Sequence, residues 1–365
     1  MKLFIILFML FTSLFATPNS WIKVWKKERK LMLMQNQKIL KTYKIALSSF
    51  APSGDKEQVG DGKTPNGRFY ICESLHKNLK AKYGARSLRL SYPNKEDARR
   101  GLRDKLINKS QYKKIIKAID KKRMPPQNTK LGSSIRIHGG GNSIDWTLGC
   151  IAMNDNDIIE LYSKIKGKTR VDVYENEVED KKLNKKNYLN REILKSAKKL
   201  MAEGCKYTQK ATGIFNMSFP YGDFDKKIGV CTDLIIRALR EVDIDLQSLL
   251  YEDLILHKKR YKKIKKINTN IDHRRTKNLK IWFDNYTQKV TDKNYIPGDI
   301  VVMDTGIRNG TKYDHIGIVS DTKYEGRYLV INLWSVGYDL NEMDLLNGKY
   351  PTVVGHYRFN HPFDY

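Results

Sequence analysis

Cys150 and His138 are the first two residues of this sequence whose types and spacing could do chemistry together. A thiol becomes a good nucleophile when a neighbouring imidazole takes its proton. Glycines 139–141 lie between the pair, and they let a ligand approach the backbone while leaving N–H groups free for an oxyanion. The segment predicts thiol acyl transfer, with a buried structural cysteine after a glycine turn as the alternative.

Cys231 and His315 form a second candidate pair in the other half of the chain. Cys231 follows Gly229 at a predicted helix start, where free N–H groups and the helix dipole are expected to lower the pKa of a thiol. His315 is expected on a strand, with Gly317 allowing the helix to approach it closely. Asn332, on the next predicted strand, could accept the other imidazole N–H and fix the ring. The alternative is that Cys231 is a core residue of an apolar helix.

Several neighbours of these residues are candidates for supporting roles. Thr147 either supports catalysis or hydrogen-bonds the backbone before Cys150. Arg136 precedes His138 by two residues, so both are expected on one face of a strand, where Arg136 contacts substrate or is a surface charge. Residues 145–146 are expected to pack the loop. In the second half, the alternatives for Asp233 and residues 273–275 are binding a charged substrate group or forming structural ion pairs.

The first half of the chain alternates apolar and polar residues in short runs, which is typical of β-strands. Strands are expected at residues 21–25, 30–34, 41–47, 68–72, 135–138 and 169–174. Helices are expected at residues 94–107, with Asn94 as N-cap, and at 109–123 and 155–165. The first two helices form an insertion, which we place beside the sheet as a lid or as a passive surface segment.

The second half mixes the two kinds of element and is expected to be α+β. Helices are expected at residues 190–202 and 229–240 and within 267–286, and strands at 295–303, 314–320 and 328–333. Residues 175–187 are almost all charged or polar, which predicts a linker between the halves.

The first 16 residues have the layout of a secretory signal peptide, with one positive charge, an apolar run and then Ala16. An uncleaved membrane anchor is the alternative, and in both cases the body of the protein is exported. The predicted division is a signal peptide at 1–16, a first domain at 20–174, a linker at 175–187 and a second domain at 188–365.

The formal net charge of +28 suits an anionic partner. Export argues against nucleic acid, and no nucleic-acid motif is visible. An anionic wall polymer fits, although a solvated basic surface is the alternative. Of the four cysteines, Cys150 and Cys231 are interpreted as functional thiols, and Cys72 and Cys205 as buried or incidental. The spacings form no zinc pattern, and neither a metal nor an organic cofactor is predicted.

Residues 20–174 resemble the YkuD domain of L,D-transpeptidases. The matching segments are Asp61-Gly-Lys-Thr-Pro-Asn-Gly67, Ile137-His-Gly139 and Thr147-Leu-Gly-Cys-Ile-Ala-Met153. The resemblance implies a β-sandwich in which Cys150 attacks the carbonyl of the third residue of a murein stem peptide. It implies that His138 is the base and later the acid, and that the amides of Gly149 and Cys150 hold the oxyanion. An amine resolves the acyl-enzyme in transpeptidases, and water resolves it in hydrolases of this fold.

Two positions depart from the family pattern. Leu148 stands where the family often has a second histidine, and Ala152 stands where it often has an arginine that helps to seat the substrate. Together with Leu90-Ser-Tyr-Pro-Asn94, this form resembles a branch that includes enzymes cleaving wall-attached lipoprotein from murein. Hydrolysis and L,D-carboxypeptidase action therefore stay open beside transpeptidation, and a wall-attached lipoprotein is a further candidate partner.

Residues 188–359 resemble a largely uncharacterised bacterial domain related to NlpC-type papain-like cell-wall peptidases. The matching segments are Gly229-Val-Cys-Thr-Asp233, Asn270-Ile-Asp-His-Arg-Arg275, Pro297-Gly-Asp299, His315-Ile-Gly-Ile-Val319 and Gly355-His-Tyr-Arg-Phe359. The resemblance implies hydrolysis of murein amides by Cys231, with His315 as base and Asn332 orienting it. Related peptidases usually carry Asp-Cys-Ser where this chain has Val230-Cys-Thr232, which weakens the link to peptidase activity.

The expected fold class is mainly β, a YkuD-like β-sandwich with inserted helices, followed by an α+β papain-like domain. The expected function is peptidoglycan remodelling in the periplasm or cell envelope, by thiol acyl transfer to stem peptides. A peptidoglycan-binding protein without catalysis is the competing class, and membrane attachment is expected only if the signal is not cleaved.

Overall fold

The computed structural model describes residues 20–77 and 79–365, so the predicted signal peptide lies outside the described residues. The chain divides into two compact units, and each is described by itself. Unit 1 comprises residues up to 56 together with 61–91 and 134–175, and unit 2 comprises residues 57–60, 92–133 and 176–365. Among the described residues, no helix has both the length and the apolar character needed to span a bilayer.

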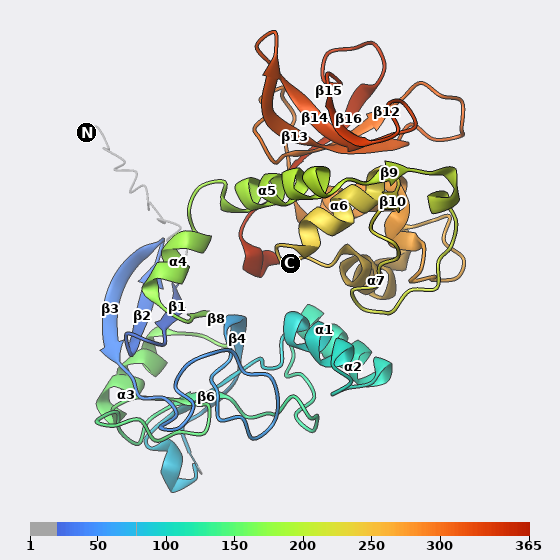
Figure 1. Ribbon diagram of the computed structural model, residues 1–365. Helices are drawn as coiled ribbons and strands as arrows, with labels where there is room; N and C mark the ends of the chain where they lie inside the picture. Colours follow the sequence, from blue (N-terminus) through green and yellow to red (C-terminus); the bar gives the residue numbers. More distant parts are fainter. Residues whose placement is uncertain (1–19, 78) are drawn as a thin grey trace, which may run out of the picture. The chain divides into compact units, whose positions relative to one another are not determined.

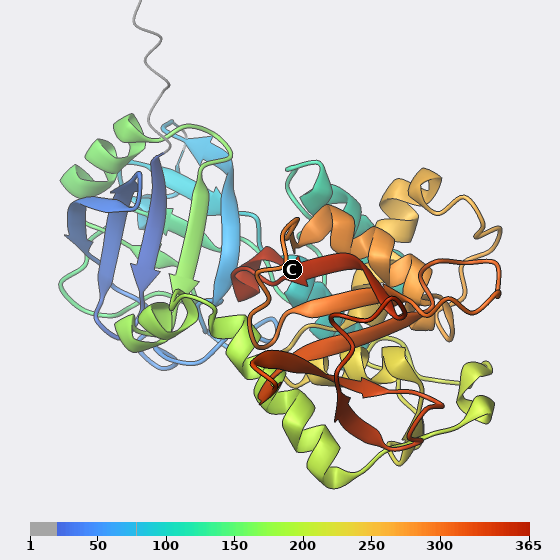
Figure 2. The same cartoon turned by 90° about the horizontal axis from the view of Figure 1, so that it is seen from above.

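Unit 1 is built on an eight-stranded sheet with the order β3-β2-β1-β8-β4-β5-β6-β7. Figure 2 shows the blue strands β1 to β3 beside the green strand β8. The strands are β1 Ser20–Trp25, β2 Lys30–Gln35, β3 Lys38–Lys44, β4 Gly67–Leu75, β5 Ser87–Leu90, β6 Arg136–His138, β7 Ile151–Ala152 and β8 Arg170–Tyr174. The helical elements of this unit are η1 Ala81–Tyr83 and α3 Asp155–Lys164.

The two edges of this sheet are joined by the chain that follows β3. Ala46 and Ala152 exchange two backbone hydrogen bonds of 2.9 Å, and Ser48 bridges to Thr147. The sheet therefore curls around its core, because the chain that continues from its first strand, β3, pairs with its last strand, β7. This bridge also holds the chain on both sides of Cys150.

Unit 2 combines helices with a six-stranded antiparallel sheet of order β11-β16-β12-β13-β14-β15. The six strands are β11 Gln288–Lys289, β12 Ile300–Asp304, β13 His315–Tyr324, β14 Arg327–Leu333, β15 Leu340–Met343 and β16 Thr352–Arg358. A separate two-stranded parallel sheet consists of β9 Lys206–Tyr207 and β10 Ile228–Gly229. The α-helices are α1 Lys95–Arg103, α2 Lys109–Asp120, α4 Glu177–Leu183, α5 Tyr188–Glu203, α6 Cys231–Arg240, α7 Leu246–His257 and α8 Thr276–Tyr286. The short helical turns are η2 Gln209–Thr212, η3 Lys258–Arg260, η4 Asp272–Arg274 and η5 Pro362–Asp364.

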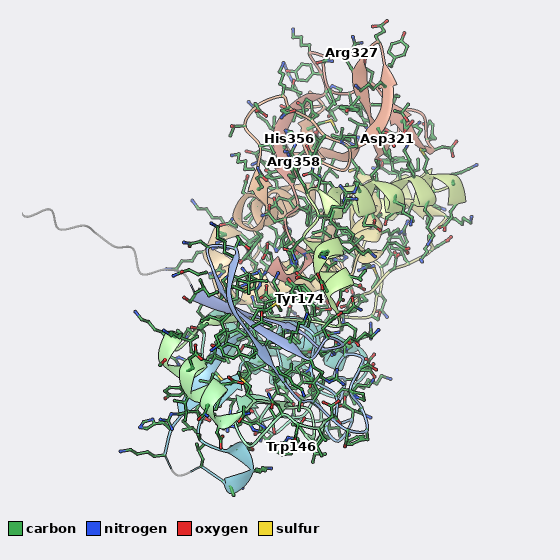
Figure 3. All side chains as sticks on the ribbon, turned by 90° about the vertical axis from the view of Figure 1, so that its left-hand side faces the viewer. Trp146, Tyr174, Asp321, Arg327, His356 and Arg358 are labelled. Carbon is green, nitrogen blue, oxygen red and sulfur yellow. The ribbon has the colours of Figure 1, made fainter. Side chains whose placement is uncertain are left out.

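The core of unit 2 lies between the sheet and the helices. Helices α5 and α6 run along one face of the sheet (Figure 1), where Leu239 of α6 and Ile316 of β13 are fully buried in the same cluster. At the sheet, buried Asp299 accepts from His356 Nε2 and from Arg358 Nη2, both at 2.7 Å. His356 and Arg358 lie close together on β16 (Figure 3), so this acid ties β12 to its neighbour.

The insertion belongs to unit 2. Arg99 of α1 donates to Glu252 of α7 at 2.8 Å, and the Tyr112 hydroxyl of α2 donates to the same carboxylate at 2.6 Å. All three side chains are buried, and Phe219 and Tyr251 pack on the same cluster. We expected this segment beside the first sheet. It packs elsewhere because α7, which sequence analysis did not predict, offers a buried anion that the insertion neutralises.

Local signals predicted most of the other elements. Asn94 is the N-cap of α1, and its side chain accepts from the Asp97 N–H at 2.9 Å. The predicted linker at 175–187 instead contains α4, because Asn176 caps it and its first turn is acidic. The expected fold class is confirmed in part. Unit 1 is built on a β-sheet and unit 2 is α+β, so the whole chain is mixed and not mainly β.

Candidate active sites

Cys150 and His138 lie on one face of two neighbouring strands. His138 ends β6, which runs parallel to β7, and Cys150 directly precedes β7. Ile137 and Ile151 are paired across the two strands, and both are fully buried in the core. Because side chains alternate along a strand and paired residues share a face, His138 and Cys150 both point away from that core. The register of β6 and β7 therefore brings the predicted nucleophile and base to the same face of the two strands, where His138 is buried.

The imidazole of His138 is held by the backbone. Its Nδ1 lies 2.7 Å from the carbonyl oxygen of Gly139. A carbonyl can only accept, so Nδ1 carries the proton and Nε2 keeps a free lone pair. Tyr83 and Trp146 flank the ring edge-on, with ring centres 5.1 and 5.6 Å away. Burial lowers the pKa of His138 to about 4, and the positive charge of Arg136 adds to this, so the ring is neutral at pH 7.

The Cys150 thiol is half-buried and lies 3.6 Å from the carbonyl oxygen of Ser134. Burial raises the pKa of the thiol, so the resting state is a neutral thiol near a neutral imidazole. In the described part of the chain, no hydrogen bond joins Cys150 directly to His138. The proton transfer therefore requires a substrate-bound arrangement in which the two groups approach.

The loop before Cys150 is fixed by hydrogen bonds to its backbone. Gly149 has a φ of +110°, and a Cβ there would lie 2.7 Å from the Lys63 carbonyl oxygen. The Thr64 hydroxyl donates to the Gly149 carbonyl at 3.0 Å, and the Thr147 hydroxyl donates to the Cys150 carbonyl at 2.7 Å. Thr147 therefore takes the backbone-bonding role that was one of its two expected roles.

Two other predicted neighbours are committed to the protein itself. Arg136 is buried, donates to Ser87 Oγ at 3.0 Å and pairs with Glu73, so it is neither a surface charge nor free for substrate. Asp145 pairs with Arg29 at 2.6 Å, as expected for a loop-packing residue. Both pairs stabilise the strands around Cys150.

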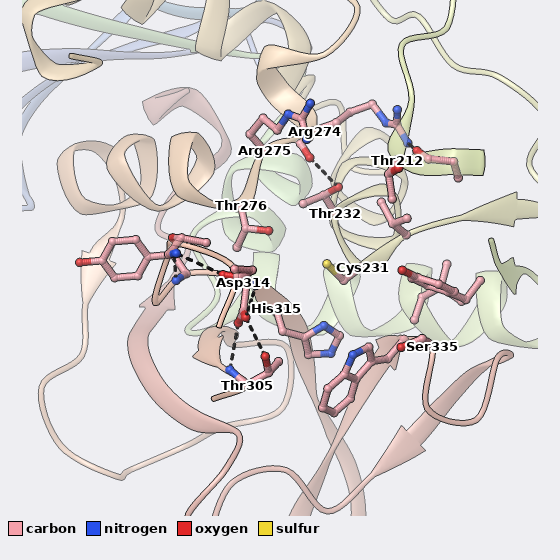
Figure 4. A pocket seen from close by; sticks show the side chains of 18 of the residues that line it. Thr212, Cys231, Thr232, Arg274, Arg275, Thr276, Thr305, Asp314, His315 and Ser335 are labelled. Carbon is pink, nitrogen blue, oxygen red and sulfur yellow. Dashed lines mark hydrogen bonds between the residues drawn. The ribbon is translucent and has the colours of Figure 1, made fainter. Parts of the chain in front are cut away.

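The second candidate pair lines a pocket of about 460 Å³ within unit 2. Cys231 begins α6, and His315 begins β13 (Figure 4). Trp334 and Thr276 line the same pocket. The structure therefore brings Cys231 and His315 into one cavity, as predicted, although they are 84 positions apart in the sequence.

Asn332 holds the imidazole of His315. The ring Nε2 lies 3.2 Å from Asn332 Oδ1, while Asn332 Nδ2 points to the oxygens of Val330 and Asn341, each at 3.4 Å. The amide oxygen accepts, so Nε2 carries the proton and Nδ1 is the free base. Trp334 covers the ring at 4.6 Å between centres, and burial lowers the pKa of His315 to about 4.

Cys231 corrects one prediction. Burial raises the pKa of its thiol to about 12, and the nearby charge of Asp233 adds to the rise. Hydrogen bonds from the Thr276 hydroxyl and from the Ile316 and Thr232 backbones oppose it without overcoming it. We expected the start of α6 to lower this pKa. The desolvation of the thiol outweighs the helix dipole, whose effect is modest.

Gly317 also has a different role from the one predicted. A Cβ at this position would lie 2.4 Å from Val330 Cγ1 and 2.9 Å from the Ile331 carbonyl oxygen. The close neighbour is therefore strand β14 and not a helix. The glycine still serves the site, because β14 carries Asn332 and must approach β13 closely.

Asp233 and Arg274 form a structural ion pair, which was one of the two alternatives. They are almost fully buried and 2.8 Å apart, and Arg274 also donates to the Gly213 carbonyl at 2.9 Å. His273 is buried and does not line the pocket. Arg275 differs from both, because its side chain is exposed and lines the pocket.

Sequence reasoning missed two residues of this site, Thr276 and Trp334. Thr276 lines the pocket with Cys231 and its hydroxyl lowers the pKa of the thiol, and Trp334 covers His315. The sequence offered no specific signal for either residue, because the helix within 267–286 was predicted without a defined start and nothing local distinguished Trp334. All four cysteines are free thiols, and the residues that the structure describes contain no metal-binding group of His, Cys, Asp or Glu.

Comparison with known proteins finds two family matches, one on each side of the predicted linker at residues 175–187. Residues 19–173 match the family described as the L,D-transpeptidase catalytic domain (YkuD). Residues 194–359 match the Domain of unknown function (DUF1287). The uncharacterized protein YijF of Escherichia coli (strain K12) is 40% identical over 153 residues, which are 39% of this chain and 70% of that protein.

Solved structures with partial likeness include the helical cell shape determining protein Pgp2 of Campylobacter jejuni, at 21% identity over 44% of this chain and a TM-score of 0.31. Bd1075 of Bdellovibrio bacteriovorus is 25% identical over 44% of this chain with a TM-score of 0.29, and NlpC2 of Trichomonas vaginalis is 20% identical over 46% with a TM-score of 0.28. The chain spans 49%, 49% and 47% of the lengths of these three proteins. The chain therefore carries an L,D-transpeptidase catalytic domain (YkuD) at residues 19–173 and a second domain of unknown function at residues 194–359, and it belongs to the family of the uncharacterized protein YijF.

Proposed function

We propose that this protein remodels peptidoglycan by forming an acyl-enzyme at Cys150. The Cys150 sulfur attacks the carbonyl of the third residue of a murein stem peptide, while His138 Nε2 takes the thiol proton. The amide bond to the fourth residue then breaks, and His138 returns the proton to the leaving amine. The observation that carries this proposal is the placement of Cys150 and His138 on one face of neighbouring strands, within the matched catalytic domain.

The acyl-enzyme is resolved by attack of either an amine or water. A second amine gives a cross-link, and water gives L,D-carboxypeptidase or hydrolase action. Leu148 is 74% exposed and Ala152 is fully buried, and both are apolar, so neither position supplies the polar group that the family often has there, including the arginine that helps to seat the substrate. This favours hydrolysis, including release of a wall-attached lipoprotein, over cross-linking.

The second proposed activity is amide hydrolysis by unit 2. Cys231, His315 and Asn332 have the order and the element types of an NlpC-type papain-like site, with the thiol at a helix start and the two partners on adjacent strands. The 460 Å³ pocket that Cys231 and His315 line is large enough for part of a peptide. For cellular location we propose the periplasm or cell envelope, on the signal-peptide pattern of residues 1–16.

Digestion of purified peptidoglycan tests both activities. The wild type, Cys150→Ala and Cys231→Ala proteins are each incubated with peptidoglycan. The released muropeptides are then separated and identified by mass spectrometry. New cross-links identify transpeptidation, loss of the fourth residue identifies carboxypeptidase action, and shortened stems identify endopeptidase action. Peptidoglycan that is bound but unchanged by the wild type would instead support a binding protein without catalysis.

A further inference from the structure

Some of the charged residues that line the Cys231 pocket are paired within the protein, and others are not. Arg274 is committed to Asp233, as described above. Asp314 accepts from the Thr305 hydroxyl at 2.6 Å and from Asn309 Nδ2 at 2.7 Å, so its carboxylate is also satisfied by the protein. The remaining cations of the lining are Arg275 and Lys277.

Arg275 and Lys277 have no such commitments. Among the described residues, neither side chain makes an ion pair or a side-chain hydrogen bond, and the Arg275 side chain is exposed. Asp272 forms no ion pair with Arg275; it accepts from the Asn268 N–H at 2.7 Å, and burial raises its pKa although the charge of Arg275 opposes the rise. Two positive charges therefore face the pocket without a counter-charge of their own.

These cations share a pocket with the Cys231 thiol. They flank Thr276, which lines the same pocket and whose hydroxyl lowers the pKa of the thiol against the effect of burial. Thr276 is buried and begins α8, and Figure 4 shows it and Arg275 among the residues around Cys231. Lys277 belongs to the lining of the same pocket. Because Cys231, Arg275 and Lys277 line one pocket of about 460 Å³, a peptide with its scissile amide at Cys231 shares that cavity with both cations.

We propose that Arg275 and Lys277 form a carboxylate-binding subsite, so that unit 2 selects peptides with a free carboxylate close to the scissile amide. The inference rests on the proposed hydrolase function of Cys231 and adds its specificity. A guanidinium binds a carboxylate through two parallel hydrogen bonds, whereas an ammonium acts as a point charge. Arg275 is therefore the main determinant and Lys277 the weaker one. Stem peptides supply this chemistry through the α-carboxylate of their γ-linked glutamyl residue.

Two synthetic stem-type peptides test the subsite, one with the free glutamyl α-carboxylate and one with that group as a carboxamide. Full-length protein carrying Cys150→Ala is compared with the same protein carrying Arg275→Gln or Lys277→Gln in addition. Arg275→Gln should lower kcat/KM for the carboxylate peptide by about tenfold or more, mainly through KM, and change the carboxamide peptide less than about twofold. Lys195→Gln removes an exposed cation outside the pocket and should change neither. Equal losses on both peptides, or no loss on either, would overturn the proposal.

Binding separates this proposal from the hydrolase function beneath it. Peptide affinity is measured with the Cys150→Ala, Cys231→Ala double variant, so that no turnover occurs. The carboxylate peptide should bind about tenfold more tightly than the carboxamide, and Arg275→Gln should remove that difference. A protein that hydrolyses neither peptide but keeps this binding difference retains the subsite and loses the hydrolase. Equal binding of the two peptides rejects the subsite, whether or not hydrolysis occurs.

Discussion

The two cysteine–histidine pairs of this chain hold their imidazoles by opposite nitrogens. In unit 1 the Nδ1–H of His138 donates to the Gly139 carbonyl oxygen, which leaves Nε2 as the base. In unit 2 the Nε2–H of His315 donates to the Asn332 amide oxygen, which leaves Nδ1 as the base. Each thiol must therefore approach its histidine from a different side of the ring. The same two residue types serve two unrelated geometries, because the surrounding fold selects the tautomer.

The pairs also differ in whether a mutation can remove the hydrogen bond that orients the histidine. A backbone carbonyl orients His138, so no substitution deletes that contact directly. A side chain orients His315, and a pocket wall that includes Trp334 covers it. Unit 2 should therefore lose its catalytic geometry by single substitutions that have no counterpart in unit 1.

The largest expected effect separates the two thiols. Cys150→Ala should abolish acyl-enzyme formation in unit 1, and Cys231→Ala should abolish amide hydrolysis in unit 2, each by at least about a thousandfold. Each variant should leave the other activity within about twofold. Rates are measured on separate peptide substrates, with the acyl-enzyme followed by intact-protein mass. If either variant removed both activities, the two pairs would not be independent sites.

Loss of the orienting amide is expected to have the next largest effect. Asn332→Ala leaves His315 free to rotate and to change tautomer, so kcat/KM for unit 2 should fall about a hundredfold with little change in KM. The Cys150 activity of the same variant serves as the internal control and should not change. A loss smaller than about threefold would show that Trp334 and the strand alone hold the ring.

Acid should weaken both units through their buried histidines. The folded pKa of His138 and of His315 is about 4, below the ordinary value of 6.5 for an unfolded chain. Between those values the unfolded state binds more protons, so the free energy of unfolding falls as the pH falls. Each histidine should account for about 2 kcal/mol of loss between pH 7 and pH 5, or about thirtyfold in the folding equilibrium.

Urea unfolding at pH 7 and pH 5 measures this loss. His138→Gln should reduce the pH dependence of unit 1, and His315→Gln should reduce that of unit 2, each by about 2 kcal/mol. A variant that keeps the full wild-type pH dependence would show that its histidine titrates normally in the folded protein.

The smallest expected effect concerns the rim of the first site. The Leu148 side chain is 74% exposed, so Leu148→Ala should change the free energy of unfolding by less than about 0.5 kcal/mol. Leu333, which lines the second pocket and is 1% exposed, is the matched contrast, and Leu333→Ala should cost about 3 kcal/mol. Chemical denaturation of both variants checks the difference. A large destabilisation by Leu148→Ala would mean that its loop packs more tightly than its exposure indicates.

Much of both sites could be predicted from local signals. Cys150 and His138 stand at the ends of short apolar runs, and parallel pairing of those runs places them on one face. Asn94 predicted the start of α1, because asparagine is a favoured N-cap residue. The contacts of the insertion could not be read in this way. They depend on Glu252, which lies 153 positions from Arg99 and on a helix that has almost no amphipathic pattern because it is buried on most sides.

By itself, the sequence determined which residues could do chemistry and on which kind of element each of them lies. It does so because nucleophiles, bases, caps and strand periodicity are properties of residue type and spacing. Only the tertiary structure decided that Cys231 has a raised pKa, that Arg274 is a structural residue while Arg275 faces the pocket, and which nitrogen of each imidazole is free. Those properties depend on burial and on hydrogen-bond partners from distant segments, and both exist only once the chain has packed.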